Sequence, residues 1–452
     1  MEKKQENTKM EKLISLCKRR GFIFQSAEIY GGLQGFWDYG PLGIELKNNI
    51  KKAWWKKFVQ ERNDVVGLDS SIVTNPTVWE KSGHVGGFSD ALVECKKCHH
   101  RFKAEDLKGN NKCPDCKGEL TEEKQFNTMF KTFIGPTEDT ASTAYLRPET
   151  AQNIFVQFDN IRQSMRKKVP FGIAQIGKAF RNEITPGNFI FRLREFEQME
   201  LEFFVNPKDD RKYFKEFVDA SYNFFIDLGI KKENIRKYEQ KGKELAHYSK
   251  ETIDLEYNFP FSGKAGSALG EDKGFAELMG IANRTDYDLK AHGIKYKDDT
   301  NKEEFVPYVI EPSAGVDRAM LAFLLDAYEE IDGGRSTTTE SNKEKEMVLR
   351  LHKDLAPYKV AVLPLSKKDE VSGPTKDLYK ELQKHWMVAY DDTSSIGRRY
   401  RRQDEIGTPY CVTYDFDSND DKKVTVRDRD TMEQERIPIS DLISYLKDKL
   451  DN

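Results

Sequence analysis

The sequence predicts an α+β fold in two parts: a long N-terminal part built on an antiparallel sheet, with a small cysteine-bearing insert, and a C-terminal α/β part. Three observations predict it. Two apolar segments, 171–183 and 196–205, flank a Pro-Gly-Asn turn, which is typical of an antiparallel hairpin. Two Cys-x2-Cys pairs lie within the N-terminal part. Beyond residue 359, strand-like and helix-like segments alternate.

At 452 residues the chain is too long for one compact domain, and two or three domains are expected. Its 73 Lys and Arg nearly balance 76 Asp and Glu, which excludes a protein that coats nucleic acid through a broadly basic surface. The start, MEKKQENTKMEK, lacks the apolar core of a signal peptide, and no apolar run approaches the ~20 residues of a membrane span. We therefore expect a cytoplasmic protein with no membrane partner.

The first strong helical signal lies near the N-terminus. Leu46, Ile50 and Trp54 recur at helical spacing and predict an amphipathic helix over 43–60. Lysines occupy much of its other face, which favours a solvated basic surface: Lys47, Lys51, Lys52, Lys56 and Lys57. Residues 69–73 are then expected to form a short strand.

Further along, the pattern predicts a helix over 210–228, a strand at 305–310 and a helix over 316–328. Two polar stretches, 262–274 and 332–346, are typical of an insertion and a linker. In the C-terminal part we expect strands at 359–365, 408–414 and 423–428, and helices at 377–385 and at the end of the chain.

The cysteine spacing predicts a structural zinc site in a ribbon-like insert. Cys95 and Cys98 form one Cys-x2-Cys pair, and Cys113 and Cys116 form the other. Each pair offers two thiolates, and two pairs complete tetrahedral zinc without leaving a position open for a catalytic water. This use of cysteine is typical of a reducing compartment.

Alternation along the hairpin predicts a polar face on strands that are otherwise apolar. Its members are Arg181, Glu183, Gln198, Glu200 and Glu202. Guanidinium groups beside carboxylates suit a triphosphate next to an ammonium group. The alternative is a solvent-exposed sheet face with paired charges.

The string EPSAGVDR (311–318) predicts a strand that runs directly into a helix. Gly315 would permit close approach of a ligand, and the helix N-terminus offers free N–H groups to an anion. Arg318 in the first turn opposes the helix dipole, which favours a role on a ligand. The alternative is a simple ion pair between Arg318 and Asp317 or another acid.

Taken in order, these strings resemble the three motifs of class II aminoacyl-tRNA synthetases, and more closely the homodimeric glycyl-tRNA synthetases. The similarity runs from about residue 10 to the end of the chain. The strings are GGLQGFWDYGPLG (31–43), NPTVWEKSGH (75–84), LRPETAQ (146–152), FRNE (180–183), FRLREFEQMELEFF (191–204), GIANRTDYDL (280–289), EPSAGVDR (311–318) and SSIGRRYRRQDEIGTP (394–409).

The resemblance implies an ATP site. Arg181 would hold the α-phosphate, Phe196 would stack on adenine, and Arg318 would contact the γ-phosphate. Glu277 would work with Mg²⁺. The implied ATP-binding residues are Arg181, Asn182, Glu183, Phe191, Arg192, Leu193, Arg194, Glu195, Phe196, Glu277, Leu278, Gly315, Val316, Asp317 and Arg318. Those implied in catalysis are Arg181, Glu183 and Arg318.

The resemblance also implies a glycine site that grips the ammonium group with Glu149, Glu200 and Glu311. Glycine has no side chain, so selection must come from the ammonium group and from a lack of room for a β-carbon. The implied glycine-binding residues are Arg101, Glu149, Phe196, Glu197, Gln198, Met199, Glu200, Arg284, Glu311 and Ser313.

The implied reaction joins glycine to tRNA(Gly) through glycyl-adenylate, with arginines and Mg²⁺ stabilising charge on the phosphoryl oxygens. The implied domains are a class II catalytic domain (1–350), a zinc-binding insert within it (91–120) and an anticodon-binding domain (351–452). A homodimer interface would include the helix around Trp54. The cluster RRYRR (398–402) would contact tRNA, or would form a helix face paired to acids such as Asp404 and Glu405.

Other classes of protein fit parts of the sequence. A catalytically inactive synthetase-like accessory protein would share the fold, but it predicts loss of phosphate-binding arginines such as Arg181 and Arg318. A zinc-ribbon nucleic-acid binder explains the cysteines but not the hairpin or EPSAGVDR. A synthetase for proline, threonine or histidine would lack LRPETAQ and GIANRTDYDL.

Overall fold

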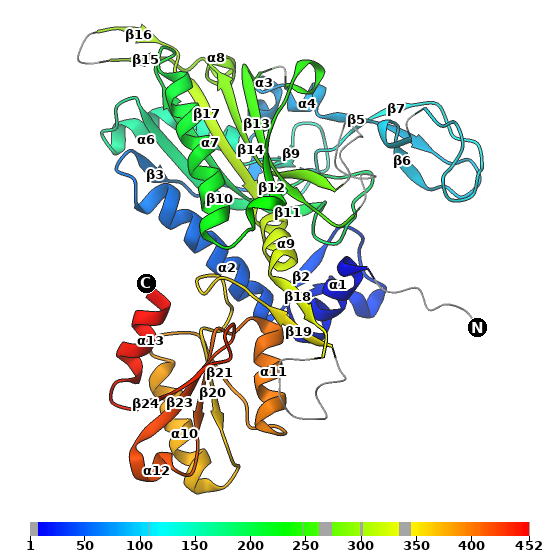
Figure 1. The fold of residues 1–452 in the computed structure, drawn as a ribbon. Coiled ribbons are helices and arrows are strands. Elements are labelled where there is room, and N and C mark those ends of the chain that lie inside the picture. The colour runs from blue at the N-terminus through cyan, green and yellow to red at the C-terminus, as the bar shows by residue number, and fades with distance from the viewer. Residues whose placement is uncertain are drawn as a thin grey trace.

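A seven-stranded sheet forms the centre of the N-terminal part (Figure 1). The structure, a computed structural model, describes residues 8–107, 109–246, 248–261, 274–298, 302–333 and 345–451. The strand order is β12-β13-β14-β17-β11-β10-β3, and the only parallel pair in this sheet joins β10 to β3. The strands are β3 (Val65–Gly67), β10 (Phe171–Phe180), β11 (Glu195–Val205), β12 (Ile235–Glu239), β13 (Glu251–Asn258), β14 (Phe275–Thr285) and β17 (Tyr308–Gly315).

The predicted central hairpin is confirmed as β10 and β11, which pair from Phe171↔Phe204 to Phe180↔Glu195. The first strand ends three residues earlier than expected, so Arg181 and Glu183 begin the connecting loop. Met199, Leu201 and Phe203 are fully buried in the core on one face of β11. Alternation therefore places Gln198, Glu200 and Glu202 on the opposite face, as predicted.

Two helices pack the apolar face of the sheet, α7 (Asp210–Asp227) and α9 (Val316–Ala327), and both were predicted. Phe217 of α7 lies 5.0 Å from Phe203, measured between ring centroids. On the other face, α5 (Ala151–Val156) and α6 (Phe158–Ser164) cover one end of the sheet through Phe155 and Phe158. The rest of that face stays open as a cleft.

The N-terminal segments lie against α9. They are α1 (Lys9–Arg20), β1 (Ile23–Gln25), β2 (Trp37–Tyr39) and α2 (Pro41–Trp55), which a π-helical turn extends over Lys56–Gln60. Thr8 caps α1 with a capping box, and Pro41 starts α2. The helix expected over 43–60 is therefore confirmed, and its solvated lysine face is confirmed at Lys52, Lys56 and Lys57. Lys47 is the exception: it is buried, and its ammonium lies 2.7 Å from Asp317.

The strand expected at 69–73 is wrong. The chain pairs as β3 before this segment and as β4 (Val73–Thr74) only from its last residue, then enters α3 (Pro76–Lys81) and α4 (His84–Gly87). Asn75 accepts a hydrogen bond from the N–H of Thr77 and caps α3.

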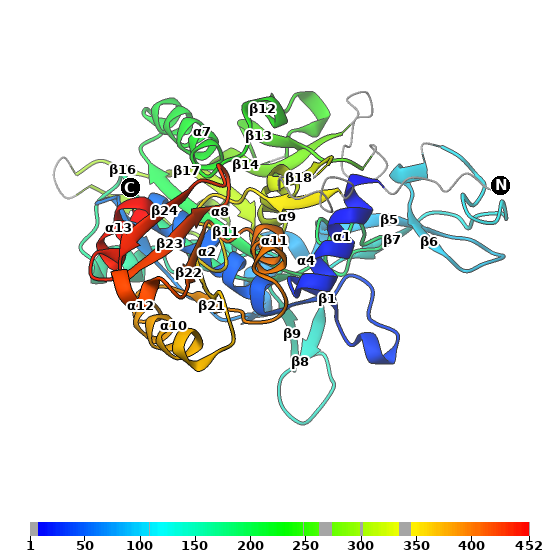
Figure 2. The same ribbon diagram turned by 60° about the horizontal axis from the view of Figure 1, so that its bottom comes forward.

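The cysteine-bearing insert projects from the rest of the N-terminal part as a three-stranded sheet in the order β6-β5-β7 (Figure 1). Its strands are β5 (Ser89–Glu94), β6 (Arg101–Lys103) and β7 (Lys124–Asn127). A hairpin of β8 (Lys131–Phe133) and β9 (Thr143–Leu146) pairs with β4 and protrudes from the body in Figure 2. Smaller elements are α8 (Tyr287–Ala291), β15 (Tyr296–Lys297), β16 (Glu304–Phe305), β18 (Tyr328–Ile331) and β19 (Glu346–Leu349).

The C-terminal part is a five-stranded sheet in the order β21-β20-β22-β23-β24, with its own core. The predicted strands are confirmed as β20 (Val360–Pro364), β22 (Tyr410–Tyr414) and β23 (Lys423–Asp428), and the terminal helix as α13 (Leu442–Asp451). The helix expected from residue 377 starts eight residues earlier, as α10 (Asp369–Leu382). The remaining elements are β21 (Val388–Tyr390), α11 (Ile396–Ile406), α12 (Ser418–Asp421) and β24 (Gln434–Pro438).

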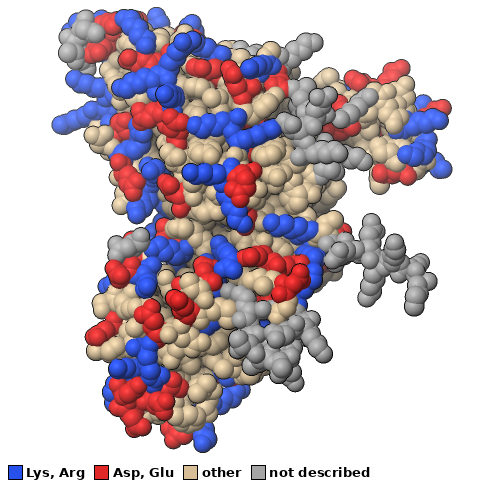
Figure 3. Space-filling view, in the orientation of Figure 1, with Lys and Arg blue, Asp and Glu red and all other residues tan. Residues whose placement is uncertain are grey.

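Acidic and basic side chains are interspersed over the face drawn in Figure 3. In the part of the chain that the structure describes, no helix is both long and apolar enough to cross a membrane. The predicted insertion at 262–274 lies outside the described residues except for Gly274, and so does the predicted linker except for 332–333 and 345–346.

Candidate active site

A cleft of about 620 Å³ lies on the open, polar face of the seven-stranded sheet. Its walls come from the β10–β11 loop, from β13, β14 and β17, and from the segment that joins α4 to the insert. Most residues predicted for the two substrates line it: Glu149, Arg181, Glu183, Phe191, Arg192, Leu193, Phe196, Gln198, Glu200, Glu277, Arg284, Glu311, Ser313, Gly315, Asp317 and Arg318.

One end of the cleft combines arginines with aromatic rings. The Arg181 guanidinium lies 5.4 Å from the ring centroids of both Phe88 and Phe196, and its Nε donates to the carbonyl of Pro148. The Arg318 guanidinium lies 4.3 Å from the centroid of Phe191. Both cations are thus held by ring faces, an arrangement that keeps a planar guanidinium oriented toward an anion.

Arg318 pairs with Glu277, so the alternative for EPSAGVDR, an ion pair of Arg318 with Asp317 or another acid, holds with Glu277 as the acid. Its Nη1 donates to the carbonyl of Glu277 at 2.8 Å and lies 3.2 Å from the carboxylate of the same residue. Gly315 has an ordinary backbone conformation, with φ −78°, and a Cβ there would meet Arg318 only at 3.7 Å. None of the described residues requires glycine at this position, so the missing side chain leaves room on the cleft side.

The other end of the cleft is rich in carboxylates. Oxygens of Glu200, Glu202 and Glu311, all buried, lie within 4.8 Å of one another. Glu200 accepts hydrogen bonds from Ser313, at 2.8 Å, and from Thr150. Three carboxylates at this spacing can bind an ammonium group or a metal cation.

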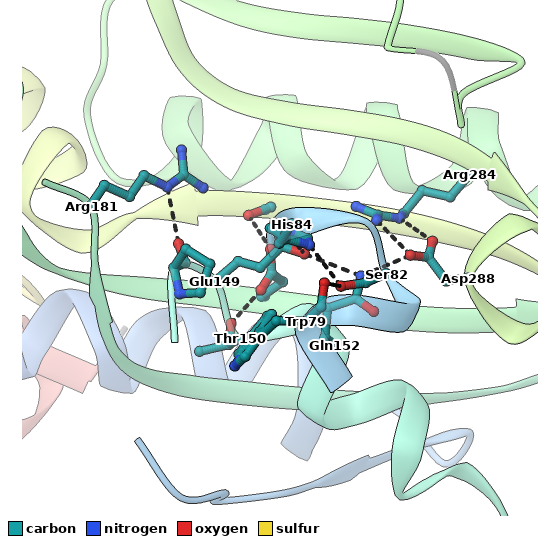
Figure 4. Close-up of polar contacts among 12 residues, drawn as sticks. Trp79, Ser82, His84, Glu149, Thr150, Gln152, Arg181, Arg284 and Asp288 are labelled. Atoms are coloured by element: carbon teal, nitrogen blue, oxygen red, sulfur yellow. Dashed lines mark hydrogen bonds and ion pairs between the residues drawn. The ribbon is translucent and has the colours of Figure 1, made fainter. Parts of the chain in front are cut away.

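Arg284 is the buried cation beside these acids. It donates to Glu311 at 2.9 Å and to both oxygens of Asp288 at 2.7 and 3.0 Å (Figure 4). Tyr248 covers its guanidinium with a ring centroid 4.1 Å away. One guanidinium shared among this many carboxylates leaves the pocket with an excess of negative charge.

This excess appears in the pKa values. Burial, together with the charge of Glu200, raises the pKa of Glu311 to about 8 although Arg284 opposes the shift. Burial also raises the pKa of Glu202 well above its usual value, with Glu311 adding to the shift. Burial would raise the pKa of Glu149 too, but His84, Arg284 and Arg181 together hold that pKa below its usual range. The pocket is therefore suited to accept one more positive charge.

Several predicted residues have other partners and do not line the cleft. Met199, Leu278 and Val316 belong to the core. The others are paired within the chain: Asn182 through its backbone N–H to Thr128, Arg194 to the carbonyls of Glu183 and Gln34, Glu195 to Lys178, Glu197 to Lys47 and Lys51, and Arg101 to Glu94. Arg101 lies at the exposed start of β6, whereas Lys103 of the same strand lines the cleft.

Asp317 lines the cleft but is already neutralised. It accepts hydrogen bonds from Lys47, Tyr39 and the backbone N–H of Glu197. Burial alone would raise the pKa of Asp317, but these donors, above all the charge of Lys47, hold that pKa below its usual value. Asp317, which was predicted to bind ATP, is thus engaged by three donors of its own chain. These contacts join α9, which carries Asp317, to α2 and to the start of β11.

Sequence patterns missed other residues of the cleft. Phe88, Asp90, Thr128, Tyr248 and Asp254 line it, and burial with the charge of Glu277 raises the pKa of Asp254 to about 7. They come from the insert boundary, from β13 and from the turn before β13, which no motif had marked. The alternation of polar Thr252, Asp254 and Glu256 along β13 is the signal that could have found one of them.

The four cysteines of the insert converge. Their sulfurs all lie within 4.8 Å of one another, with Cys95 Sγ 3.5 Å from Cys116 Sγ and Cys98 Sγ 3.6 Å from Cys113 Sγ. This donor set fits a tetrahedral metal ion, as the spacing predicted.

The basic cluster at 398–402 is mostly internal. Arg399 is buried and donates to the carbonyl of Ser394, Arg402 pairs with Asp391 at 2.5 Å, and Tyr400 shares a hydrogen bond with Thr413. The helix-face alternative therefore fits Arg402, although its acid is Asp391 and not one of those expected, whereas Arg399 donates to backbone carbonyls. Asp404 and Glu405 instead pair with Arg427 and with Arg19 and Arg20.

Comparison with known proteins gives two family matches. Residues 131–328 match the tRNA synthetase class II core domain (G, H, P, S and T), and residues 359–449 match the anticodon binding domain. Proteins called glycine–tRNA ligase are similar over nearly their whole length. The one from Thermobifida fusca is 52% identical over 98% of both chains. The one from Clostridium acetobutylicum is 52% identical over 99% of this chain and 100% of its own. The one from Streptomyces coelicolor is 51% identical over 98% of both.

Proposed function

Because the chain belongs to the glycine–tRNA ligase family of class II synthetases, we propose that it activates glycine with ATP and transfers it to tRNA(Gly). The observation that carries the proposal is the cleft itself, in which a pocket of buried carboxylates adjoins two arginines held by aromatic rings. The carboxylates suit the ammonium group of an amino acid, and the arginines suit a polyphosphate.

Glycine is recognised by charge. Glu149, Glu200 and Glu311 accept from its ammonium group, while Ser313 and Arg284 hold two of these carboxylates in place. Since the ammonium replaces the missing positive charge of the pocket, a neutral ligand of the same size would leave buried carboxylates uncompensated.

ATP lies at the arginine end of the cleft. Arg181 takes the α-phosphate, Phe196 stacks on adenine, and Arg318 with Glu277 approaches the γ-phosphate. Mg²⁺, when bound, would neutralise charge on the phosphoryl oxygens. The residues of the chain supply orientation: they hold the glycine carboxylate in line with the α-phosphorus, so that pyrophosphate leaves and glycyl-adenylate forms. The ribose hydroxyl of the tRNA then attacks the carbonyl of the adenylate.

The same proposal covers the remaining parts of the chain. Residues 351–452 would bind the anticodon end of the tRNA, residues 1–350 would form the catalytic domain, and the insert at 91–120 would hold structural Zn²⁺. Exposed Arg398 is the residue of the basic cluster best placed for a phosphate. We place the reaction in the cytoplasm.

A homodimer is also part of the proposal, with a corrected interface. Trp54 is fully buried in the core of its own subunit and cannot pack against a partner. Exposed apolar residues lie instead between β1 and β2, where Ile29 and Tyr30 are each 87% exposed and Leu33 is 55% exposed. This segment supports an interface with a second copy.

Exchange of labelled pyrophosphate into ATP, with each amino acid tested separately, decides the function. We expect exchange with glycine and not with alanine or serine. Glu200→Gln, which removes one pocket charge, should abolish most of the exchange, whereas Glu381→Gln, at a surface ion pair of the C-terminal part, should retain it. Folded protein that gives no exchange with any amino acid would instead support the inactive accessory protein.

A further inference from the structure

His84 lies directly behind the carboxylate pocket. Its Nε2 is 3.5 Å from Glu149 Oε1, and its side chain is 12% exposed (Figure 4). His84 does not line the cleft, so it reaches a ligand only through Glu149. No motif assigned it a role, although it closes the string NPTVWEKSGH.

Several contacts fix the orientation of the His84 imidazole. Ser82 Oγ lies 2.8 Å from Nδ1. The rings of Trp79 and Phe88 lie 5.4 and 5.1 Å from the imidazole centroid. The backbone that carries the ring is fixed too, because Asn127 of β7 donates to the carbonyls of His84, at 3.3 Å, and Val85, at 2.9 Å. A ring held in this way has one direction in which to point Nε2.

Glu149 itself has few restraints. Besides His84, the recorded donor to its carboxylate is Gln152 Nε2 at 3.3 Å, and that amide also donates to Asp288 at 2.8 Å (Figure 4). A carboxylate only accepts hydrogen bonds, so the ring nitrogen that faces it carries the proton. His84 thereby decides how Glu149 presents its oxygens to the cleft.

A serine nucleophile is excluded by the same geometry. Ser82, His84 and Glu149 lie in a row, with a hydrogen bond between Ser82 and His84 and a 3.5 Å contact between His84 and Glu149, but Ser82 is buried beside the carbonyl of Trp79 and does not line the cleft. A substrate in the cleft meets Glu149, at the opposite end of the row.

We propose that His84 is a positioning residue for glycine: by donating from Nε2 it orients Glu149 toward the ammonium group. This rests on the proposed role of the carboxylate pocket in binding glycine. His84 also joins that pocket to the insert, since the segment that holds it runs from α3 to β5 and is pinned by Asn127 of β7. Donor–acceptor distances of this kind often shorten once a ligand is bound.

The test compares a variant that keeps a donor with one that does not. His84→Gln retains an amide N–H, and His84→Phe retains a ring without a donor. In glycine-dependent pyrophosphate exchange we expect His84→Phe to raise the KM for glycine about tenfold, as loss of one charged hydrogen bond predicts, with the KM for ATP unchanged. His84→Gln should stay within about threefold of the native KM. His385→Gln, at an exposed histidine of the C-terminal part, is the matched control.

A mutant cycle with Glu149→Gln separates positioning from a general structural role. In that background His84→Phe should add little to the KM for glycine, because the carboxylate it orients is gone. The proposal is overturned if the two effects multiply, if the KM for ATP rises equally, or if His84→Gln is as impaired as His84→Phe. If His84→Phe does not fold, His84→Met serves as the variant without a donor. Failure of the native chain to exchange with glycine would refute the proposed function instead.

Discussion

The buried ion pair between Lys47 and Asp317 gives a prediction that can be worked through in energy. Each side chain is 3% exposed, and their charged atoms lie 2.7 Å apart. Removing one partner of a buried pair strands the other charge and typically costs about 3–5 kcal/mol. Lys47 keeps Glu197 at 3.3 Å, and Asp317 keeps Tyr39 and a backbone N–H, so we expect the low end, about 3 kcal/mol, for Lys47→Met or Asp317→Asn alone.

The double variant should cost far less than the sum, because neither charge is then stranded. We expect the double variant to cost no more than either single variant, about 3 kcal/mol, which is a coupling of about 3 kcal/mol. Urea unfolding followed by tryptophan fluorescence measures it, since Trp37, Trp54, Trp55 and Trp79 all precede residue 80 and Trp386 can be replaced by Phe. Single-variant costs that add within about 0.5 kcal/mol would refute the assignment of a coupled buried pair.

Three further predictions concern titration and metal. The value of kcat/KM for glycine should rise with pH up to about 8, because Glu311 must lose its proton to accept an ammonium group; a flat profile from pH 6 to 9 would contradict this. The pKa of Glu202 is higher in the folded state than in the unfolded state, so Glu202 destabilises the folded state increasingly as pH rises above about 4.5. The Tm of Glu202→Gln should therefore fall less steeply with rising pH than the Tm of the native chain. Cys113→Ser should lower bound zinc from about one ion per chain and expose residues 89–127 to proteolysis, while Cys411→Ser keeps its zinc in elemental analysis.

Features that depend on residues close together in the chain could be predicted from the sequence. Helix periodicity predicted α7 and α9, strand alternation predicted the polar face of β11, and cysteine spacing predicted the cluster around Cys95. Each of these features is determined by residues close together in the chain, so it does not depend on how distant segments pack.

The features that the sequence did not predict depend on contacts between distant segments of the chain. Lys47 looks like part of a solvated face until Asp317, 270 residues away, is brought against it. Strands β12, β13 and β14 were not predicted, although they complete the main sheet. A polar, glycine-rich stretch separates β13 from β14 in the sequence, and β13 carries Asp254 and Glu256, residue types that strands usually disfavour. His84 was missed for the same reason, because only the fold places it against Glu149.

Helix α2 contacts both halves of the molecule within one turn. Lys47 reaches Asp317 in the cleft, and Asn49, two residues on, donates to the carbonyls of Leu355 and Ala356 at the entry to the C-terminal part. Arg20 adds a second link to Glu405 of α11. The two halves are consequently not freely exchangeable modules. A chimera that took its C-terminal half from another synthetase would have to reproduce the backbone at 355–356 and the acid at 405, or its catalytic half would lose the support of α2.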